Sequence, residues 1–147
     1  MSTISTLNNL IETLKDGQEG FRAASEDIGS SELKTLFSKY SLQRSQFAGE
    51  LQEAVISLGD HDPADSGSVA GAVHRGWIDL KAALMSKDEH AVLAECERGE
   101  DVAVAAYRKA LEEEDLPSNI RAIVQKQAAE VKAAHDKVRN LRDSVAV

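Results

Sequence analysis

The stretch DHDPADSG, residues 60–67, is the clearest break in the helical pattern of this sequence, and its position decides the fold. Aspartate, proline, glycine and serine together favour turns and oppose the continuation of a helix. On both sides of the break, apolar residues recur three and four positions apart, which is the spacing of one face of a helix. No stretch alternates as a half-buried strand would, so the sequence predicts an all-α protein.

Two long helices are predicted before the break, over residues 3–28 and 31–58. Gly29 separates them in the usual role of a glycine that takes a left-handed conformation at a helix end. Ser30 or Ser31 can cap the second helix by accepting a hydrogen bond from a free backbone N–H group. Because the loop between them is very short, the two helices must lie antiparallel as a hairpin.

Three helices are predicted after the break, over residues 68–85, 87–114 and 117–145. Ser86 and Glu89 have the spacing of a capping box at the start of the second of these. The last two helices form another antiparallel hairpin. The connection between the hairpins is long enough to run the full length of a bundle whose helices are each about 40 Å long.

Such a long connection makes the second and third long helices parallel, which is the single-crossover, ferritin-like arrangement rather than up-down-up-down. Small residues over 70–76 would let the crossover helix lie close against the bundle. We therefore predict one ferritin-like four-helix-bundle domain over residues 1–147. It consists of two antiparallel hairpins with an additional helix in the crossover.

Composition restricts the classes of partner. The net charge of −8 disfavours nucleic acid, because backbone phosphates demand a concentrated basic face. No apolar run approaches the length of a membrane span, and the N-terminus lacks a signal pattern, so we expect a cytoplasmic protein without a membrane partner. Cys96 is the only cysteine, which excludes a disulfide within the chain, and we expect it to be a small core residue.

The stretch ECERGEDVAVAAYRKAL, residues 95–111, carries the strongest chemical signal. It places Glu100, Ala103 and Tyr107 in the pattern E-x-x-A-x-x-x-Y, which resembles a carboxylate-bearing helix of ferritin-like di-iron proteins. Those proteins hold their metal with one Glu from each of two helices and Glu-x-x-His from each of the other two. An unpaired buried carboxylate is costly, so Glu100 must bind a metal, hold a proton or accept hydrogen bonds.

The other helices lack the remaining ligands of a di-iron site. Gln43-x-x-Gln46 is the nearest match to Glu-x-x-His in the second helix, and Lys132 stands three residues before His135 in the last. A neutral hydrogen-bonded layer accounts for the inward polar residues without a metal, because amides can donate to a carboxylate and accept from a phenol. The layer so predicted contains Gln18, Gln43, Glu100, Tyr107 and Gln127.

Five segments carry a resemblance over nearly the whole chain: NNLIETLKDGQEGFRAASED, LFSKYSLQRSQFAGEL, GSVAGAVHRGWIDLKAAL, LAECERGEDVAVAAY and EVKAAHDKVRNLRD. They are similar to a bacterial family of four-helix-bundle proteins of unknown function in the ferritin-like superfamily. The resemblance implies a ferritin-like bundle, often found in stress-related settings, with no established reaction and no catalytic residues.

Two functions remain open at this point. The leading hypothesis is a non-enzymatic, stress-associated bundle with a degenerate di-iron site and no cofactor, which acts as a homo-oligomer or through a protein partner. The alternative is a metal-binding oxidase or metal-storage protein, with iron or manganese centred on Glu100 and His135. An error of one residue in helical phase would add further carboxylate ligands to that site. These candidates are Glu19, Glu50 and Glu130.

The predicted crossover helix carries the best candidate for a partner surface, formed by His74, Arg75 and Trp77. Trp and Arg are favoured anchors of protein interfaces, so this face would serve as a docking site if it were exposed. Packing of Trp77 onto the bundle is the expectation that we prefer. A small apolar ligand held between the bundle and the crossover is a third hypothesis, which nothing in the sequence selects.

Overall fold

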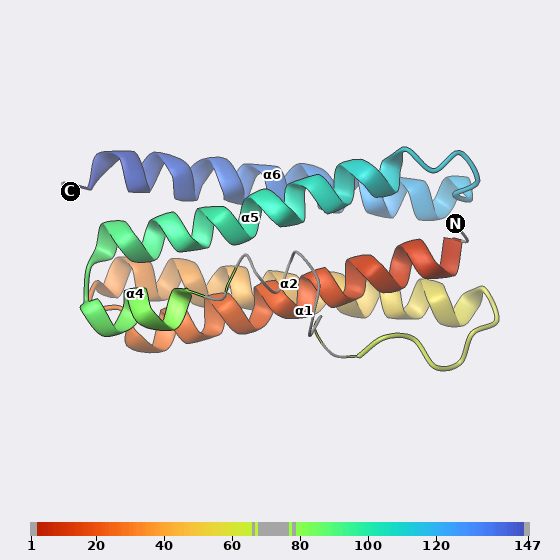
Figure 1. The fold of residues 1–147 in the computed structure, drawn as a ribbon. Helices are drawn as coiled ribbons and strands as arrows, with labels where there is room; N and C mark the ends of the chain where they lie inside the picture. The colour runs from red at the N-terminus through yellow and green to blue at the C-terminus, as the bar shows by residue number, and fades with distance from the viewer. Residues whose placement is uncertain (1–2, 66, 68–76, 78, 146–147) are drawn as a thin grey trace.

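The computed structural model describes residues 3–65, 67, 77 and 79–145. Within them the chain forms α1 (Thr3–Asp27), α2 (Ser31–Ser57), α4 (Leu80–Ser86), α5 (Glu89–Leu111) and α6 (Ser118–Ser144). Figure 1 shows α1 and α2 as one antiparallel hairpin and α5 and α6 as another, stacked on each other. Because α2 and α5 run in the same direction, the predicted single-crossover bundle is confirmed.

The four long helices end within a few residues of the predicted positions. The additional helix predicted over 68–85 differs more, because helix begins only at Leu80 among the described residues of that range and ends at Ser86. Residues 68–76 and 78, and with them His74 and Arg75, lie outside the described residues. The short helix α4 packs against α1 and α5, at the end of the bundle where α5 begins (Figure 1).

Side-chain caps fix two of the helix starts. The Ser30 hydroxyl accepts a hydrogen bond from the Leu33 amide at 3.3 Å, as predicted for the start of α2. The predicted capping box of Ser86 is wrong, because Asp88 caps α5 instead by accepting from the Ala91 amide at 3.3 Å. Ser86 belongs to the last turn of α4, which ends where Lys87 takes a left-handed conformation.

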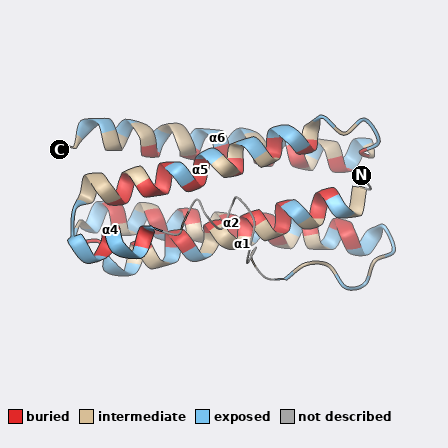
Figure 2. Ribbon diagram, viewed as in Figure 1, coloured by how far each residue is buried: buried red, intermediate tan, exposed pale blue. Residues whose placement is uncertain are grey.

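Buried residues recur along all four long helices, as the colouring of the ribbon in Figure 2 shows. They form two apolar clusters, one centred on Leu14 and Val124 and the other on Phe21 and Leu93. Cys96 is fully buried in the second cluster, and burial raises the pKa of its thiol well above the ordinary value. None of the helices among the described residues is long and apolar enough to cross a membrane.

Trp77 packs onto the bundle, in agreement with the preferred expectation for this residue. Its ring meets Phe21 edge-on, with 5.2 Å between the ring centroids. It also lies directly over Gly20 of α1 and Gly99 of α5, since a Cβ atom added at either position would come within 2.3 Å of the indole. The two glycines therefore form the seat of the tryptophan.

Candidate functional site

A buried ion pair occupies the centre of the bundle. Arg44 from α2 meets Glu100 from α5 in a two-pronged contact, with Nη1–Oε1 at 2.5 Å and Nη2–Oε2 at 2.6 Å. The two side chains are 1% and 0% exposed. A planar guanidinium matches both oxygens of a carboxylate in this geometry, and such contacts are among the strongest hydrogen bonds in proteins. Both oxygens of Glu100 are therefore engaged by one cation.

The surroundings of Arg44 fit a guanidinium. Gly17 packs against it, since a Cβ atom there would lie 3.4 Å from Nη1. Nε donates to Oε1 of Gln43 at 3.2 Å, and the Phe21 ring lies 5.3 Å from Cζ. Desolvation opposes the charge on Arg44, but the charge of Glu100 and its hydrogen bonds outweigh that effect and raise the pKa of the guanidinium. The arginine stays charged inside the bundle.

These core residues do not fit a pair of metal ions. A di-iron centre needs several carboxylates to neutralise at least four positive charges. Among the described residues, Glu100 is the carboxylate that is completely buried between the hairpins, and Arg44 already neutralises it. A single ion at Glu100 would have to displace the guanidinium and leave a buried cation unpaired, which is strongly unfavourable.

A second buried polar chain links α5, α6 and α2. The Tyr107 hydroxyl donates to Oε1 of Gln127 at 2.8 Å. The Gln127 amide group donates in turn to Oε1 of Glu50 at 2.8 Å and to the Phe47 carbonyl at 3.2 Å. Burial raises the pKa of Tyr107, so the phenol remains a hydrogen-bond donor. Protein groups thus satisfy both the acceptor and the donor of the Gln127 side chain.

The remaining members of the predicted polar layer are arranged differently. The side-chain oxygen of Gln43 accepts a hydrogen bond from the Arg44 guanidinium. The prediction had been that the Gln43 amide would donate to Glu100. Gln18 is half-buried, and its Oε1 has no hydrogen-bond partner among the described residues. The layer therefore separates into an ion pair with a supporting amide and a chain through Tyr107.

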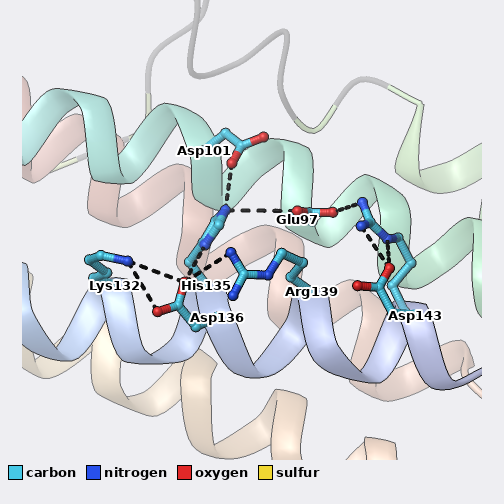
Figure 3. Close-up of polar contacts among 8 residues, drawn as sticks. Glu97, Asp101, Lys132, His135, Asp136, Arg139 and Asp143 are labelled. Carbon is cyan, nitrogen blue, oxygen red and sulfur yellow. Dashed lines mark hydrogen bonds and ion pairs between the residues drawn. The ribbon is translucent and has the colours of Figure 1, made fainter.

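His135 lies at the outer seam between α5 and α6, where several charged groups meet (Figure 3). Its Nε2 is 2.5 Å from Oδ1 of Asp101 and 3.9 Å from Oε2 of Glu97. Its Nδ1 is 3.0 Å from Oδ1 of Asp136. Burial lowers the pKa of His135, but the hydrogen bonds to Asp136 and Asp101 outweigh that effect and raise it overall.

Basic residues of α6 surround this group. Lys132 contacts Asp136 at 3.1 Å, and Arg139 lies 3.7 Å from the same carboxylate. Arg142 contacts Glu97 and, at 2.8 Å, Asp143. The Asp101 side chain is 62% exposed, and its contact in this group is the one with His135. We refer to Glu97, Asp101 and His135 as the seam cluster.

The recorded contacts of Glu100 and His135 lead to different parts of the molecule, one to Arg44 and the other to the seam cluster. A metal held jointly by Glu100 and His135 stays a prediction. The additional carboxylate candidates are all exposed, although two have partners: Glu19 pairs with Arg22, and Glu50 accepts from Gln127. The third, Glu130, is on the outer side of α6.

Sequence reasoning missed Arg44, Glu97 and Asp101. A signal existed for the last two, because residues four apart on a helix share a face and both are acidic. A signal existed for Arg44 too, because it lies four residues after Tyr40 and three before Phe47, which are both buried, and so shares their face of α2.

Comparison with known proteins agrees with this architecture. A family model described as a domain of unknown function, DUF2383, matches residues 2–113. No curated protein matches the sequence significantly. Among solved structures, a mutant of Dps1 from Mycobacterium smegmatis is similar at 15% sequence identity and a TM-score of 0.72, over 95% of this chain and 94% of that one. At this identity the likeness concerns the fold alone, which is Dps-like and hence ferritin-like.

Proposed function

We propose, from the premise that this chain belongs to the DUF2383 family of domains of unknown function, that it is a non-enzymatic bundle protein that acts by self-association. The stress-related setting implied by the sequence resemblance is part of the proposal. The observation that carries its non-enzymatic part is the Arg44–Glu100 pair, which fills the centre of a ferritin-like bundle with a protein cation.

The ion pair argues against oxidation chemistry at the core. Metal-dependent oxidases of this fold need carboxylate oxygens that can bind ions directly. Here both oxygens of Glu100 accept hydrogen bonds from Arg44 at 2.5 and 2.6 Å. Removing one member of a buried pair generally costs about 3–5 kcal/mol, so a metal that displaced the guanidinium would have to offset that loss.

The outer face of α2 supports self-association. Leu42 and Ile56 are large apolar residues whose exposed fractions are 60% and 44%. Gly49 lies midway between them, and a Cβ atom added there would meet nothing within 4 Å. Spacings of seven residues place all three on one side of the helix. A glycine between two exposed apolar residues lets a second helix approach closely, and a second copy of the chain offers a matching stripe.

Sedimentation analysis of the purified protein over a wide concentration range tests this proposal. We expect the wild type to associate and the double variant Leu42→Glu/Ile56→Glu to be monomeric. Lys126→Glu, on the exposed side of α6, is the matched control, since it changes the net charge by the same amount. A wild type that is monomeric at all concentrations would overturn the proposal.

Elemental analysis distinguishes the metal-dependent alternative. The protein should be purified without chelators or a metal-binding tag, after growth in medium supplemented with iron and manganese. We expect far less than two ions of iron or manganese per chain. About two ions per chain, lost in Glu100→Ala while the helical content is retained, would support an oxidase or metal-storage protein instead.

A further inference from the structure

We propose that the seam cluster binds one divalent transition-metal ion between α5 and α6. The cluster combines an imidazole nitrogen with two carboxylate oxygens, and these three ligand atoms lie within 4.8 Å of one another. Imidazole and carboxylate together suit first-row ions such as zinc, cobalt or manganese. The site is separate from Glu100, and the inference does not rest on the function proposed above.

The backbone of two helices positions the three ligands. Glu97 and Asp101 are four residues apart on α5, so both side chains leave the same face of the helix. His135 approaches from the antiparallel helix α6 and points its Nε2 between them (Figure 3). Ligands from two helices need no change in either backbone to converge on one ion.

The distances are close to those of a coordinated ion. Zinc binds nitrogen and carboxylate oxygen at about 2.0–2.2 Å, which places tetrahedral ligands about 3.4 Å apart. The Nε2–Oε2 distance to Glu97 is 3.9 Å, so this pair needs only a small adjustment. The Nε2–Oδ1 distance to Asp101 is 2.5 Å and must lengthen, which the largely exposed Asp101 side chain can do by a rotation.

The arrangement around His135 resembles the outer shell of a metal site. A metal-bound histidine usually gives its second ring nitrogen to a carboxylate, which fixes the ring and its tautomer. Asp136 has that position, 3.0 Å from Nδ1, and Lys132 holds Asp136 from the other side at 3.1 Å. Nε2 is thereby directed at Glu97 and Asp101.

The site also has an entry route and an open coordination position. Asp101 is 62% exposed, whereas His135 is 14% exposed, so an ion can reach the imidazole from the Asp101 side. Water would complete the coordination. Arg142 competes for Glu97 but also contacts Asp143 at 2.8 Å, which gives it a second carboxylate when an ion takes Glu97.

Calorimetric titration of tag-free protein with Zn²⁺ tests the proposal, after chelator treatment and removal of the chelator. We expect one ion per chain in the wild type. Binding should weaken more than 100-fold in His135→Gln and Asp101→Asn. Asp136→Asn should weaken it about 10–100-fold, as is typical when an outer-shell partner is lost. Co²⁺ should give visible absorption bands in the wild type that disappear in His135→Gln.

Two variants are matched controls for these substitutions. His61→Gln removes an exposed loop histidine, and Glu130→Gln removes an exposed carboxylate of α6. Both should bind Zn²⁺ like the wild type. Circular dichroism checks that each variant is folded, and Asp101→Asn is informative even if His135→Gln is not, because Asp101 is exposed. If the wild type did not bind Zn²⁺ even at millimolar concentration, the seam cluster would be only a set of ion pairs, and the proposal would be overturned. So would unchanged affinity in Asp101→Asn and His135→Gln, or an equal loss in His61→Gln.

Discussion

The centre of the bundle and the α5–α6 seam both hold carboxylates against nitrogen cations, but they differ in access to water. Arg44 and Glu100 are sealed between the hairpins, whereas the seam cluster opens to solvent through Asp101. A sealed pair cannot exchange its partner without leaving a buried charge, while an open cluster can exchange a proton for another cation. In this bundle, burial separates a structural ion pair from a candidate binding site.

The largest effect is expected from breaking the sealed pair. Arg44→Met leaves the Glu100 carboxylate buried and uncompensated, which should lower the free energy of unfolding by about 3–5 kcal/mol. Urea denaturation measures the change. The double variant Arg44→Met/Glu100→Leu is the control, because an apolar pair of similar volume removes the lone charge and should recover most of the loss. A loss below about 1 kcal/mol in the single variant would show that water reaches the pair.

A smaller effect is expected from the buried hydrogen bond between Tyr107 and Gln127. Tyr107→Phe removes the donor to Gln127 and leaves its Oε1 buried without that hydrogen bond. An unsatisfied buried acceptor costs about 1–3 kcal/mol, measurable by the same urea denaturation. Gln127→Leu in the Tyr107→Phe background should restore part of the stability, since both polar partners are then absent. Additive losses in the double variant would contradict this account.

The next prediction concerns the packing of Trp77 against Gly20 of α1. Gly20→Ala places a methyl group against the indole and should cost about 1–3 kcal/mol through overpacking. Gly29→Ala is the control in the turn between α1 and α2, where an added Cβ atom would meet nothing within 4 Å and alanine should stabilise the fold by about 0.4–1 kcal/mol. Thermal unfolding should therefore shift in opposite directions for the two variants. A similar shift in both would mean that Trp77 does not depend on the glycine.

The smallest effect is expected at the seam, in metal-free protein. Asp136 and Asp101 raise the pKa of His135 above its ordinary 6.5, so the folded state holds the proton more tightly than the unfolded state. The resulting stabilisation is fully present below about pH 6.5 and is lost as the pH rises through the raised value. Melting temperatures of the wild type and His135→Gln should therefore converge on going from pH 6 to pH 9. A difference in melting temperature that stays constant with pH would contradict the raised pKa of His135.

The sequence was sufficient to predict the bundle, because the residues that end its helices and the spacing of its apolar residues can be recognised locally. Gly29 and the break at residues 60–67 fixed the hairpins and the crossover between them. Helix ends were less certain where two residues compete for a cap, as Ser86 and Asp88 do before α5. In the crossover, a helical pattern did not guarantee helix, since Trp77 lies in a turn just before α4.

The site was predictable only in part, because one residue along a helix turns a side chain by about 100°. On α2, Gln43 was expected to be the inward polar residue, whereas its neighbour Arg44 is the one that enters the core. On α5, His135 lies against Asp101, with 2.5 Å between Nε2 and Oδ1, and Glu97, with 3.9 Å between Nε2 and Oε2, and neither carboxylate was among the candidate residues. A charged residue in a core also has no local signature until its counter-charge on another helix is known.

The pairing of Arg44 with Glu100 has a consequence for how the two hairpins assemble. The pair joins α2 of the first hairpin to α5 of the second, across 56 positions of the chain. Sliding one hairpin by a single helical turn, about 5.4 Å, would separate the charges. Each charge would then be buried in an apolar interior without a partner, which is strongly destabilising. The pair therefore favours one alignment of the two hairpins along the bundle axis. If two chains exchanged a hairpin, Arg44 of one chain would meet Glu100 of the other in the same geometry. Domain swapping would therefore preserve the ion pair, whereas misalignment of the hairpins would break it.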